Sequence, residues 1–156
     1  DNISINTLIA ASTLERKEIF QTADINFDIF NGKINLDKTK FINKKIGKVE
    51  IENSNLFLKD DKLTLNADII IDINNTDNLF SLLQTKKTSR KLIKNILINL
   101  DYDFYTNQIV FNNMKIDNIE VNKELLAILD GFNDNNLNNF NKSKRLINTI
   151  FNAYEG

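Results

Sequence analysis

The alternation of apolar and polar residues, interrupted by two-residue turn sequences, is the feature that most limits how this chain can fold. Between residues 24 and 30 every second residue is apolar, and the dipeptide Asn31-Gly32 follows directly. Asn-Gly favours a type I′ turn because both central residues of that turn need a positive φ. The segment is therefore predicted to form a β-hairpin whose apolar side chains share one face. Its predicted pairs are Ile29 with Ile34 and Phe27 with Leu36.

A second hairpin is predicted around Asp60-Asp61, ahead of the longest alternating segment in the chain. Residues 63–73 carry an apolar side chain at every odd position and mostly polar ones between them. A strand of this length would extend about 36 Å at about 3.3 Å per residue, which is long for a strand. The predicted pairs of the hairpin are Leu58 with Leu63 and Leu56 with Leu65.

A third hairpin is predicted at Thr106-Asn107. The alternation changes phase soon afterwards, at Asn112-Asn113, and a similar change occurs within residues 53–56. Such changes are typical of β-bulges, which insert one extra residue into a strand and increase its twist. The predicted pairs of this hairpin are Phe104 with Ile109 and Tyr102 with Phe111.

Three helical segments interrupt or follow the strands. Thr76 or Asp77 is placed to cap a short helix rich in leucine and phenylalanine. Residues 121–132 and 143–154 carry apolar side chains at helical spacing. The Asn-rich segment 133–142 between them is predicted to be a linker, with the second helix amphipathic and C-terminal.

The fold is predicted to be mainly β, in the α+β class. We expect a long, twisted antiparallel meander sheet or half-barrel with a few inserted and C-terminal helices. Within the first 23 residues, Ile3 and Ile5 indicate a strand and residues 12–15 match a capping box. The apolar face of such a sheet is closed on itself, covered by the helices or partly open. The predicted domains are a twisted β domain over 1–132, the linker over 133–142 and the last helix over 143–156.

The side chains needed for most catalytic and metal chemistry are missing from the sequence. The chain has no cysteine and no histidine, which excludes thiolate catalysis, imidazole acid–base chemistry and the usual zinc sites. Its 20 basic and 21 acidic residues give a net charge of −1, which provides no field for binding nucleic acid. No apolar run approaches the roughly 20 residues needed to cross a bilayer. If the parent protein has a membrane anchor, we expect that anchor outside this segment.

Acidic residues are the remaining candidates for catalysis or metal binding. Asp101 and Asp103 project from one predicted strand face, and we interpret them as solvated, because a glycosidase pair needs one desolvated carboxyl group. Asp72 and Asp77 lack the regular Asp-x-Asp-x-Asp-Gly spacing of a calcium loop, so helix capping is the better interpretation. We therefore predict no catalytic residue, no metal ligand and no cofactor.

A basic stretch follows the short apolar helix, and two interpretations of it stay open. The basic side chains could attract anionic lipid headgroups or an acidic partner, at about 1 kcal/mol per charge near a membrane surface. Alternatively, they belong to a solvated loop in which lysines protect the start of the next strand. The stretch consists of Lys86, Lys87, Arg90, Lys91 and Lys94.

The predicted hairpins, the short helix rich in leucine and phenylalanine and the basic stretch after it follow one another in a characteristic order. This order resembles the C-terminal region of AsmA-like bacterial envelope proteins. The resemblance spans about residues 24–120 and rests on strand rhythm and turn placement. It implies a strongly twisted β-sheet or β-groove module. The parent proteins are anchored in the inner membrane of Gram-negative bacteria with their bulk in the periplasm. The segments that carry the resemblance are 30–36, 48–58 and 63–73, then Leu79-Phe80, Arg90-Lys91 and the strand pair within 93–117.

The resemblance also implies a role in outer-membrane biogenesis, in which relatives conduct phospholipids along an apolar groove without active-site residues. The leading hypothesis is a non-enzymatic periplasmic β module that contributes such a groove. Its expected partners are phospholipid or another acyl lipid and the remainder of a membrane-anchored chain, with no nucleic acid. The predicted lipid-binding residues are Leu63, Leu65, Ile69, Ile71, Ile98, Leu100, Tyr102 and Phe104.

Two alternatives belong to other classes of protein. The first is a closed structural or protein-interaction module, whose apolar face is sealed by the helices at 121–132 and 143–154. The second is an enzyme acting on sugar polymers through paired aspartates, which would need a cleft containing one desolvated carboxyl group. The extent to which the helices cover the apolar face distinguishes the first alternative from the leading hypothesis.

Overall fold

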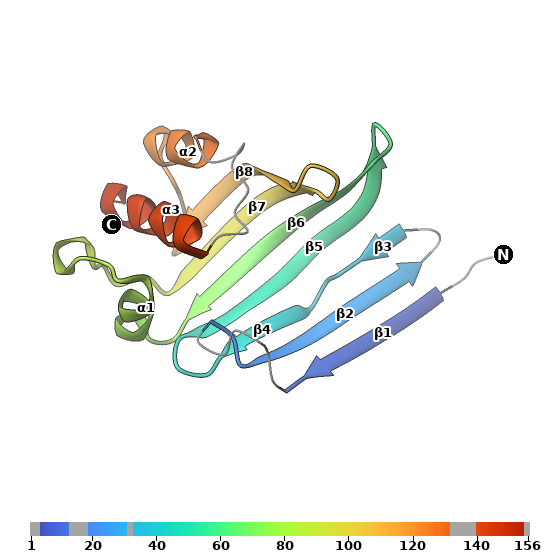
Figure 1. The fold of residues 1–156 in the computed structure, drawn as a ribbon, viewed down its shortest axis with the longest axis horizontal. Helices are drawn as coiled ribbons and strands as arrows, with labels where there is room; N and C mark the ends of the chain where they lie inside the picture. Colours follow the sequence, from blue (N-terminus) through green and yellow to red (C-terminus); the bar gives the residue numbers. More distant parts are fainter. Residues whose placement is uncertain (1–3, 13–18, 31–32, 132–139, 155–156) are drawn as a thin grey trace.

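The computed structural model describes residues 4–12, 19–30, 33–131 and 140–154. Within these residues nine strands form one antiparallel sheet, and three α-helices gather at one side of it (Figure 1). This confirms the predicted mainly β fold, a meander with inserted and C-terminal helices. The strands are β1 (Ser4–Ala11), β2 (Thr22–Phe30), β3 (Lys33–Asn35), β4 (Thr39–Asn43), β5 (Gly47–Lys59), β6 (Lys62–Ile73), β7 (Asn95–Asp103), β8 (Gln108–Ile116) and β9 (Ile119–Glu120). The helices are α1 (Thr76–Leu83), α2 (Lys123–Asp130) and α3 (Phe140–Ala153), with a 3₁₀ turn, η1, at Lys87–Ser89.

The hairpin between β5 and β6 forms the centre of the sheet and confirms its prediction. Asp60 and Asp61 both have positive φ, 51° and 60°, as a type I′ turn requires. The register pairs Leu58 with Leu63 and Leu56 with Leu65, as predicted. The two strands have 13 and 12 residues and are the longest in the sheet.

Both predicted phase changes are bulges. The register of β5 against β6 shifts between Glu52 and Asn55, and Asn53 takes up the extra residue with a φ of 49°. The register of β7 against β8 shifts beside Asn99, where Asn112 is the extra residue. Each bulge returns the following apolar side chains to the face used before it, because one inserted residue reverses the alternation once.

The predicted register of the third hairpin is wrong by two residues. Tyr102 pairs with Ile109, and the turn has four residues, Phe104 to Asn107. The Asp103 carboxylate stabilises this longer turn by accepting hydrogen bonds from the backbone N–H groups of Tyr105 (2.7 Å) and Thr106 (2.9 Å). A shift of two leaves every side chain on its predicted face, so the apolar pattern alone does not distinguish the two registers.

The first hairpin is confirmed only near its turn. Ile29 pairs with Ile34 as predicted, but the ladder ends at Asn35 and the predicted pair of Phe27 with Leu36 is not part of it. The chain turns at Lys38, whose φ is 67°, and re-enters the sheet as β4. The predicted turn residues, 31–32, lie outside the described residues.

The helices begin and end close to their predicted bounds. Asn75 caps α1, in place of the predicted Thr76 or Asp77, and its side chain accepts a hydrogen bond from the Asn78 N–H (2.9 Å). The helix predicted from residue 121 begins at Lys123, after the cap Asn122. Residues 140–142, predicted as linker, belong to α3, while 133–139 lie outside the described residues. The predicted N-terminal strand is β1, while Ile3 and most of the predicted capping box, 13–15, are also outside them.

The helices pack on the sheet around β6, β7 and β8. Phe80 of α1 and Phe151 of α3 meet edge to face, with ring centroids 5.5 Å apart. Asn148 of α3 donates a hydrogen bond to the Leu83 carbonyl at the end of α1 (2.8 Å) and accepts one from the Thr85 hydroxyl (2.6 Å). These contacts fix α3 against α1 and close the core on this side of the sheet.

Gly47 begins β5 in a backbone conformation that needs glycine. Its φ is 155°, and an added Cβ would lie 1.9 Å from the Asp72 carbonyl oxygen. A Cβ added to Gly131, at the end of α2, would lie 3.5 Å from its nearest neighbouring atom. The first position therefore tolerates no side chain, whereas the second has ordinary contact distances.

We expect Gly47→Ala to lower the free energy of unfolding by about 2 to 4 kcal/mol, because the backbone of β6 must move to admit the methyl group. Gly131→Ala is the control and should change it by no more than about 0.5 kcal/mol. Urea unfolding followed by circular dichroism measures both. Equal stability of the two variants would contradict the close approach of β5 and β6 at this end.

Candidate functional site

The register brings most apolar side chains of the long strands to one face of the sheet. Ile69 of β6 lies beside Ile51 of β5 and Ile98 of β7, and Ile98 lies beside Met114 of β8. The same face continues through Ile34 of β3 to β2 and β1. A single apolar face thus runs across the sheet from β8 to β1.

The helices cover only part of this face. The buried hydrophobic cluster draws its strand residues from β6, β7 and β8, and its other members from α1, α2, α3 and Ile93. Among the described residues of β1 to β5, the only buried hydrophobic side chain is Ala23. Figure 1 shows the helices beside β6 to β8, while β1, β2 and β3 lie away from them. The face is therefore sealed at one half and uncovered at the other.

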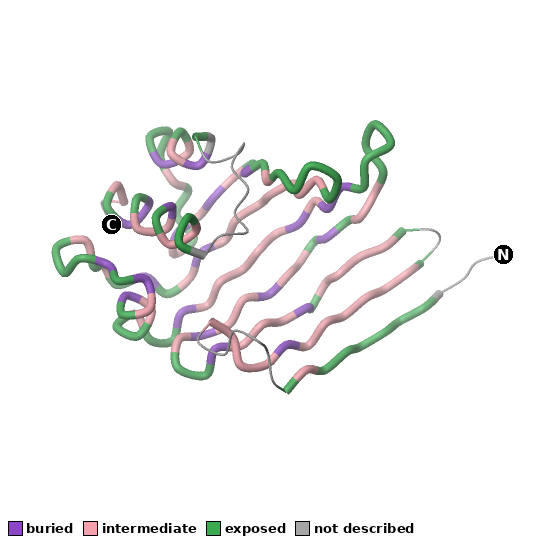
Figure 2. The backbone as a smooth tube through the Cα atoms, viewed as in Figure 1, coloured by how far each residue is buried: buried purple, intermediate pink, exposed green. Residues whose placement is uncertain are grey.

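We call the uncovered half the open apolar face. Its side chains range from half-buried on β2 to largely exposed at the ends: Ile5 is 46% exposed, Ile9 55% and Leu58 69%. Figure 2 shows the same gradient, with β1 exposed along nearly all of its length. An apolar surface of this continuity on a folded domain marks a binding site for another apolar group. The open apolar face consists of Ile5, Ile9, Ile25, Phe27, Ile29, Ile34, Leu56, Leu58 and Leu63.

An apolar pocket of about 160 Å³ lies where the covered and uncovered halves meet. Val49 and Ile71 form its floor on the sheet, and Leu79 and Leu82 of α1 line it together with Ile147 of α3. Further apolar wall comes from Ile19, Phe20 and Ile46, and from Ile73 and Leu83. The Phe20 ring also packs on Phe41 of β4, with centroids 5.6 Å apart. The segment before β2 therefore closes the pocket from the uncovered side.

The predicted lipid-binding residues straddle this boundary. Ile71, Ile98 and Leu100 pack against the helix-covered cluster, and Leu65 is buried at 8% exposure. Ile69 and Tyr102 are half-buried. Leu63 and Phe104 are exposed, and the Phe104 ring packs against Tyr102. Only the members nearest the β5–β6 and β7–β8 turns thus lie on uncovered surface.

The larger uncovered area, on β1, β2 and β3, was missed at the sequence level. The alternation of β2 is as clear as that of β6. The residue types therefore gave no reason to expect the uncovered area on one strand and not on the other. The available signal was the position of the helices in the chain. All three follow β6, and short connections keep consecutive elements together.

The basic stretch follows α1 at the helix side of the sheet. The Arg90 guanidinium donates to the Thr85 carbonyl (3.1 Å) and lies 5.9 Å from the centre of the Phe80 ring. The Lys91 ammonium donates to the Tyr154 carbonyl and lies 5.5 Å from that tyrosine ring. Lys86 and Lys87 are exposed beside η1. Two of the five predicted headgroup residues therefore also hold the ends of α1 and α3.

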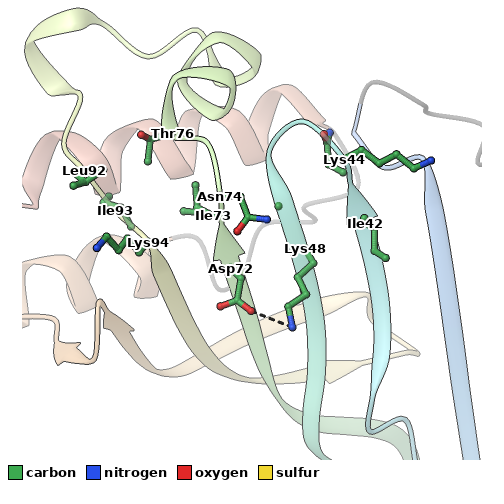
Figure 3. Close-up of a pocket in the computed structure, with 12 residues that line it drawn as sticks. Ile42, Lys44, Lys48, Asp72, Ile73, Asn74, Thr76, Leu92, Ile93 and Lys94 are labelled. Atoms are coloured by element: carbon green, nitrogen blue, oxygen red, sulfur yellow. Dashed lines mark ion pairs between the residues drawn. The ribbon is translucent and has the colours of Figure 1, made fainter.

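Lys94, the last of the five, lines a second pocket of about 650 Å³ on the polar side of the strand ends (Figure 3). Lys48 and Asp72 form an ion pair at its centre, 3.2 Å apart, and the exposed Leu92 lies at its rim. This pocket and the apolar pocket adjoin the same strand ends, because they share Asn43, Gly47, Lys48, Asp72 and Ile73. The ion pair is complete, which favours a solvent-filled recess.

The polar face of the sheet carries one charged network. Glu50 accepts from Lys48 at 2.8 Å and pairs with Lys40 at 3.1 Å. Burial by itself would raise the pKa of Glu50, but the two ammonium groups outweigh it and hold that pKa below its ordinary value. Burial and the neighbouring Glu50 carboxylate raise the pKa of Glu52, two residues along β5. Ionisation of Glu50 therefore stabilises the folded state, whereas ionisation of Glu52 opposes folding.

The two aspartates considered for sugar chemistry are engaged by hydrogen bonds. Asp101 accepts one from the Asn66 side chain at 2.7 Å. Hydrogen bonds from the backbone N–H groups of Thr106 and Tyr105 hold the pKa of Asp103 below its ordinary value. A general acid needs a raised pKa, whereas the pKa of Asp103 is lowered. No cluster of three or more metal-ligating side chains occurs among the described residues.

We expect Glu50→Gln to lower the free energy of unfolding at pH 7 by about 1 kcal/mol, since Lys40 and Lys48 lose their shared carboxylate. A lowered folded pKa means that the stabilisation is present above the ordinary value of 4.5 and is lost as pH falls through the folded pKa. The difference from the wild type should therefore disappear on acidification. Urea unfolding between pH 7 and pH 3 measures it.

Glu52→Gln is the matched control on the same strand face. The raised pKa of Glu52 means that its ionised form opposes folding, so this variant should be at least as stable as the wild type at pH 7. A loss of stability equal to that of Glu50→Gln would contradict the assignment of the network to Glu50.

No described helix is long and apolar enough to span a bilayer. Comparison with family models, with curated proteins and with solved structures gives no match for this chain. The candidate site therefore rests on the geometry of the sheet, its uncovered apolar half and the apolar pocket at the boundary.

Proposed function

We propose that this chain is a non-enzymatic β module that holds the acyl chains of lipids on its open apolar face. The observation that carries the proposal is the absence of any buried hydrophobic side chain larger than alanine among the described residues of β1 to β5. These strands nevertheless direct regular rows of isoleucine, leucine and phenylalanine to one face. Covering these rows with another apolar group lowers the free energy, because it removes apolar surface from water.

The dimensions of the open apolar face suit an acyl chain. β2 has nine residues and is about 30 Å long at about 3.3 Å per residue. One lipid tail spans about 15 Å, half of a bilayer core of about 30 Å. Each methylene group removed from water contributes about 0.8 kcal/mol. A tail lying along this face would therefore gain binding energy from most of its length.

The apolar pocket supports the same proposal. It opens at the boundary of the covered half and is lined almost wholly by apolar atoms, so it suits the end of a hydrocarbon chain better than a polar headgroup. The headgroup would then remain near the rim of the sheet. Lys86 and Lys87 lie exposed after α1, whose Leu79 and Leu82 line the pocket, and are placed to attract an anionic headgroup.

The proposed cellular setting rests on the resemblance of residues 24–120 to AsmA-like proteins. We propose that the module lies on the periplasmic side of the inner membrane of a Gram-negative bacterium, within a longer membrane-anchored chain, and serves outer-membrane biogenesis. The long antiparallel strands and the single apolar face support this setting. A closed structural or protein-interaction module is the alternative, and the sealed helix cluster over β6 to β8 is the observation that favours it.

The test is the binding of a fluorescent fatty acid, together with mass spectrometry of lipid extracted from protein purified from a bacterial host. We expect co-purified lipid, and we expect Phe27→Asp to weaken fatty-acid binding about tenfold or more, because an unpaired carboxylate would face the hydrocarbon chain. Circular dichroism should show an unchanged fold. Leu58→Asp, at a position that is 69% exposed, provides a second variant with little risk to folding.

Val110→Asp is the matched control. Val110 is also exposed, at 45%, but it pairs with Asp101 on the polar face of the sheet. Its replacement should leave fatty-acid binding unchanged. Absence of lipid, or equal loss of binding in the Phe27, Leu58 and Val110 variants, would favour the closed structural module.

A separate expectation concerns the headgroup. The double variant Lys86→Ala/Lys87→Ala should bind vesicles containing phosphatidylglycerol about tenfold or more weakly, since each surface charge contributes about 1 kcal/mol. Vesicles of phosphatidylcholine alone should show no difference. Lys59→Ala/Lys62→Ala, at the far tip of the β5–β6 hairpin, is the control of equal charge, and flotation assays measure both. Equal weakening by the two double variants would contradict a headgroup site beside η1.

A further inference from the structure

Among the described residues, β1 is an edge strand that lacks the usual protections against pairing. It forms the end of the sheet order and pairs with β2 alone within the described residues. Residues 5–10 are all exposed, as Figure 2 shows for nearly the whole strand. The strand has eight residues and contains no charged residue, no proline and no glycine. Monomeric proteins protect such edges with charge, proline, bulges or short length.

The opposite edge of the sheet carries these protections. β9 has only two residues, and its Glu120 forms an ion pair with Lys115 of β8. β8 is also interrupted by the bulge at Asn112. The β9 edge is therefore protected against pairing, whereas the described β1 edge is open to it.

We propose that a second copy of this chain pairs with β1 as an antiparallel strand, about a two-fold axis through Thr7. The sequence of the strand is symmetric about this residue on its apolar face, where Ile5 and Ile9 lie at equal distances from Thr7. The pairing places Ile5 of each copy opposite Ile9 of the other, and the two Thr7 side chains opposite each other. Pairs of β-branched side chains stabilise antiparallel strands, and the absence of charge on β1 removes like-charge repulsion.

The geometry of this pairing has a consequence for the apolar face. A two-fold axis between antiparallel edge strands runs perpendicular to the sheet, so the same face of both copies points to the same side. The two nine-stranded sheets then join into one, and the two open apolar faces become continuous. The pairing does not require bound lipid, so this inference is independent of the proposed function.

The oligomeric state in solution tests the inference. Light scattering coupled to size-exclusion chromatography should show a dimer that dissociates on dilution. Thr7→Lys places two ammonium groups opposite each other and should give a monomer, whereas Thr7→Val should remain dimeric. Val110→Lys, near the opposite edge, should not affect the dimer. A wild-type chain that is monomeric at all concentrations would overturn the inference, as would a dimer that persists in Thr7→Lys.

Cysteine cross-linking tests the register, because the chain has no cysteine of its own. Under mild oxidation Thr7→Cys should form disulfide-linked dimers, while Ile5→Cys and Ile9→Cys alone should form few. A mixture of these two variants should cross-link, since the pairing brings position 5 of one copy to position 9 of the other. Equal cross-linking of all three single variants would indicate random collision and would contradict the register. The same result would be expected if the edge serves a strand from a different protein.

Discussion

The structure depends on keeping most apolar side chains of the long strands on one face of the sheet. The period of a strand is two residues, so one inserted residue would send all later apolar side chains to the opposite face. The bulges at Asn53 and Asn112 prevent this, because each coincides with a reversal of the sequence alternation. Val49 and Leu56 on β5 therefore share a face although they differ in parity, and the same holds for Phe111 and Met114 on β8.

A single apolar face on a broad sheet creates a problem of coverage. Eight strands side by side span about 34 Å at about 4.8 Å each, whereas one helix is about 10 Å wide. Two of the three helices have only eight residues, and Asn148 binds α3 to the end of α1. The helices are thus confined to the β6–β8 half, and the apolar rows of β1 to β5 are left for another occupant. The proposed lipid binding and the proposed pairing through β1 are two separate consequences of this confinement.

On the polar face, asparagine side chains form hydrogen bonds between neighbouring strands. Amide side chains bridge to carboxylates on the neighbouring strand, as Asn99 and Asn53 both do to Asp68 at 2.8 Å and Asn95 does to Asp72 at 2.7 Å. These bonds satisfy acidic groups that would otherwise repel one another along β6. Asn53 at its bulge shows that the same residue type also tolerates the positive φ that irregular positions require.

The sequence alone was enough to predict the longer strands, the bulges and the single apolar face, because all three follow from local alternation and turn chemistry. It determined the register of the β5–β6 hairpin, where two positive-φ aspartates define the turn, but not that of β7–β8, where the hydrogen bonds of Asp103 extend the turn by two residues. Which half of the face is covered depends on how the helices pack on the sheet. Phe27 on β2 and Ile98 on β7 occupy equivalent positions in their patterns, and the docking of α1, α2 and α3 buries the surroundings of Ile98 alone. That difference arises from contacts between segments far apart in the chain, which no local pattern contains.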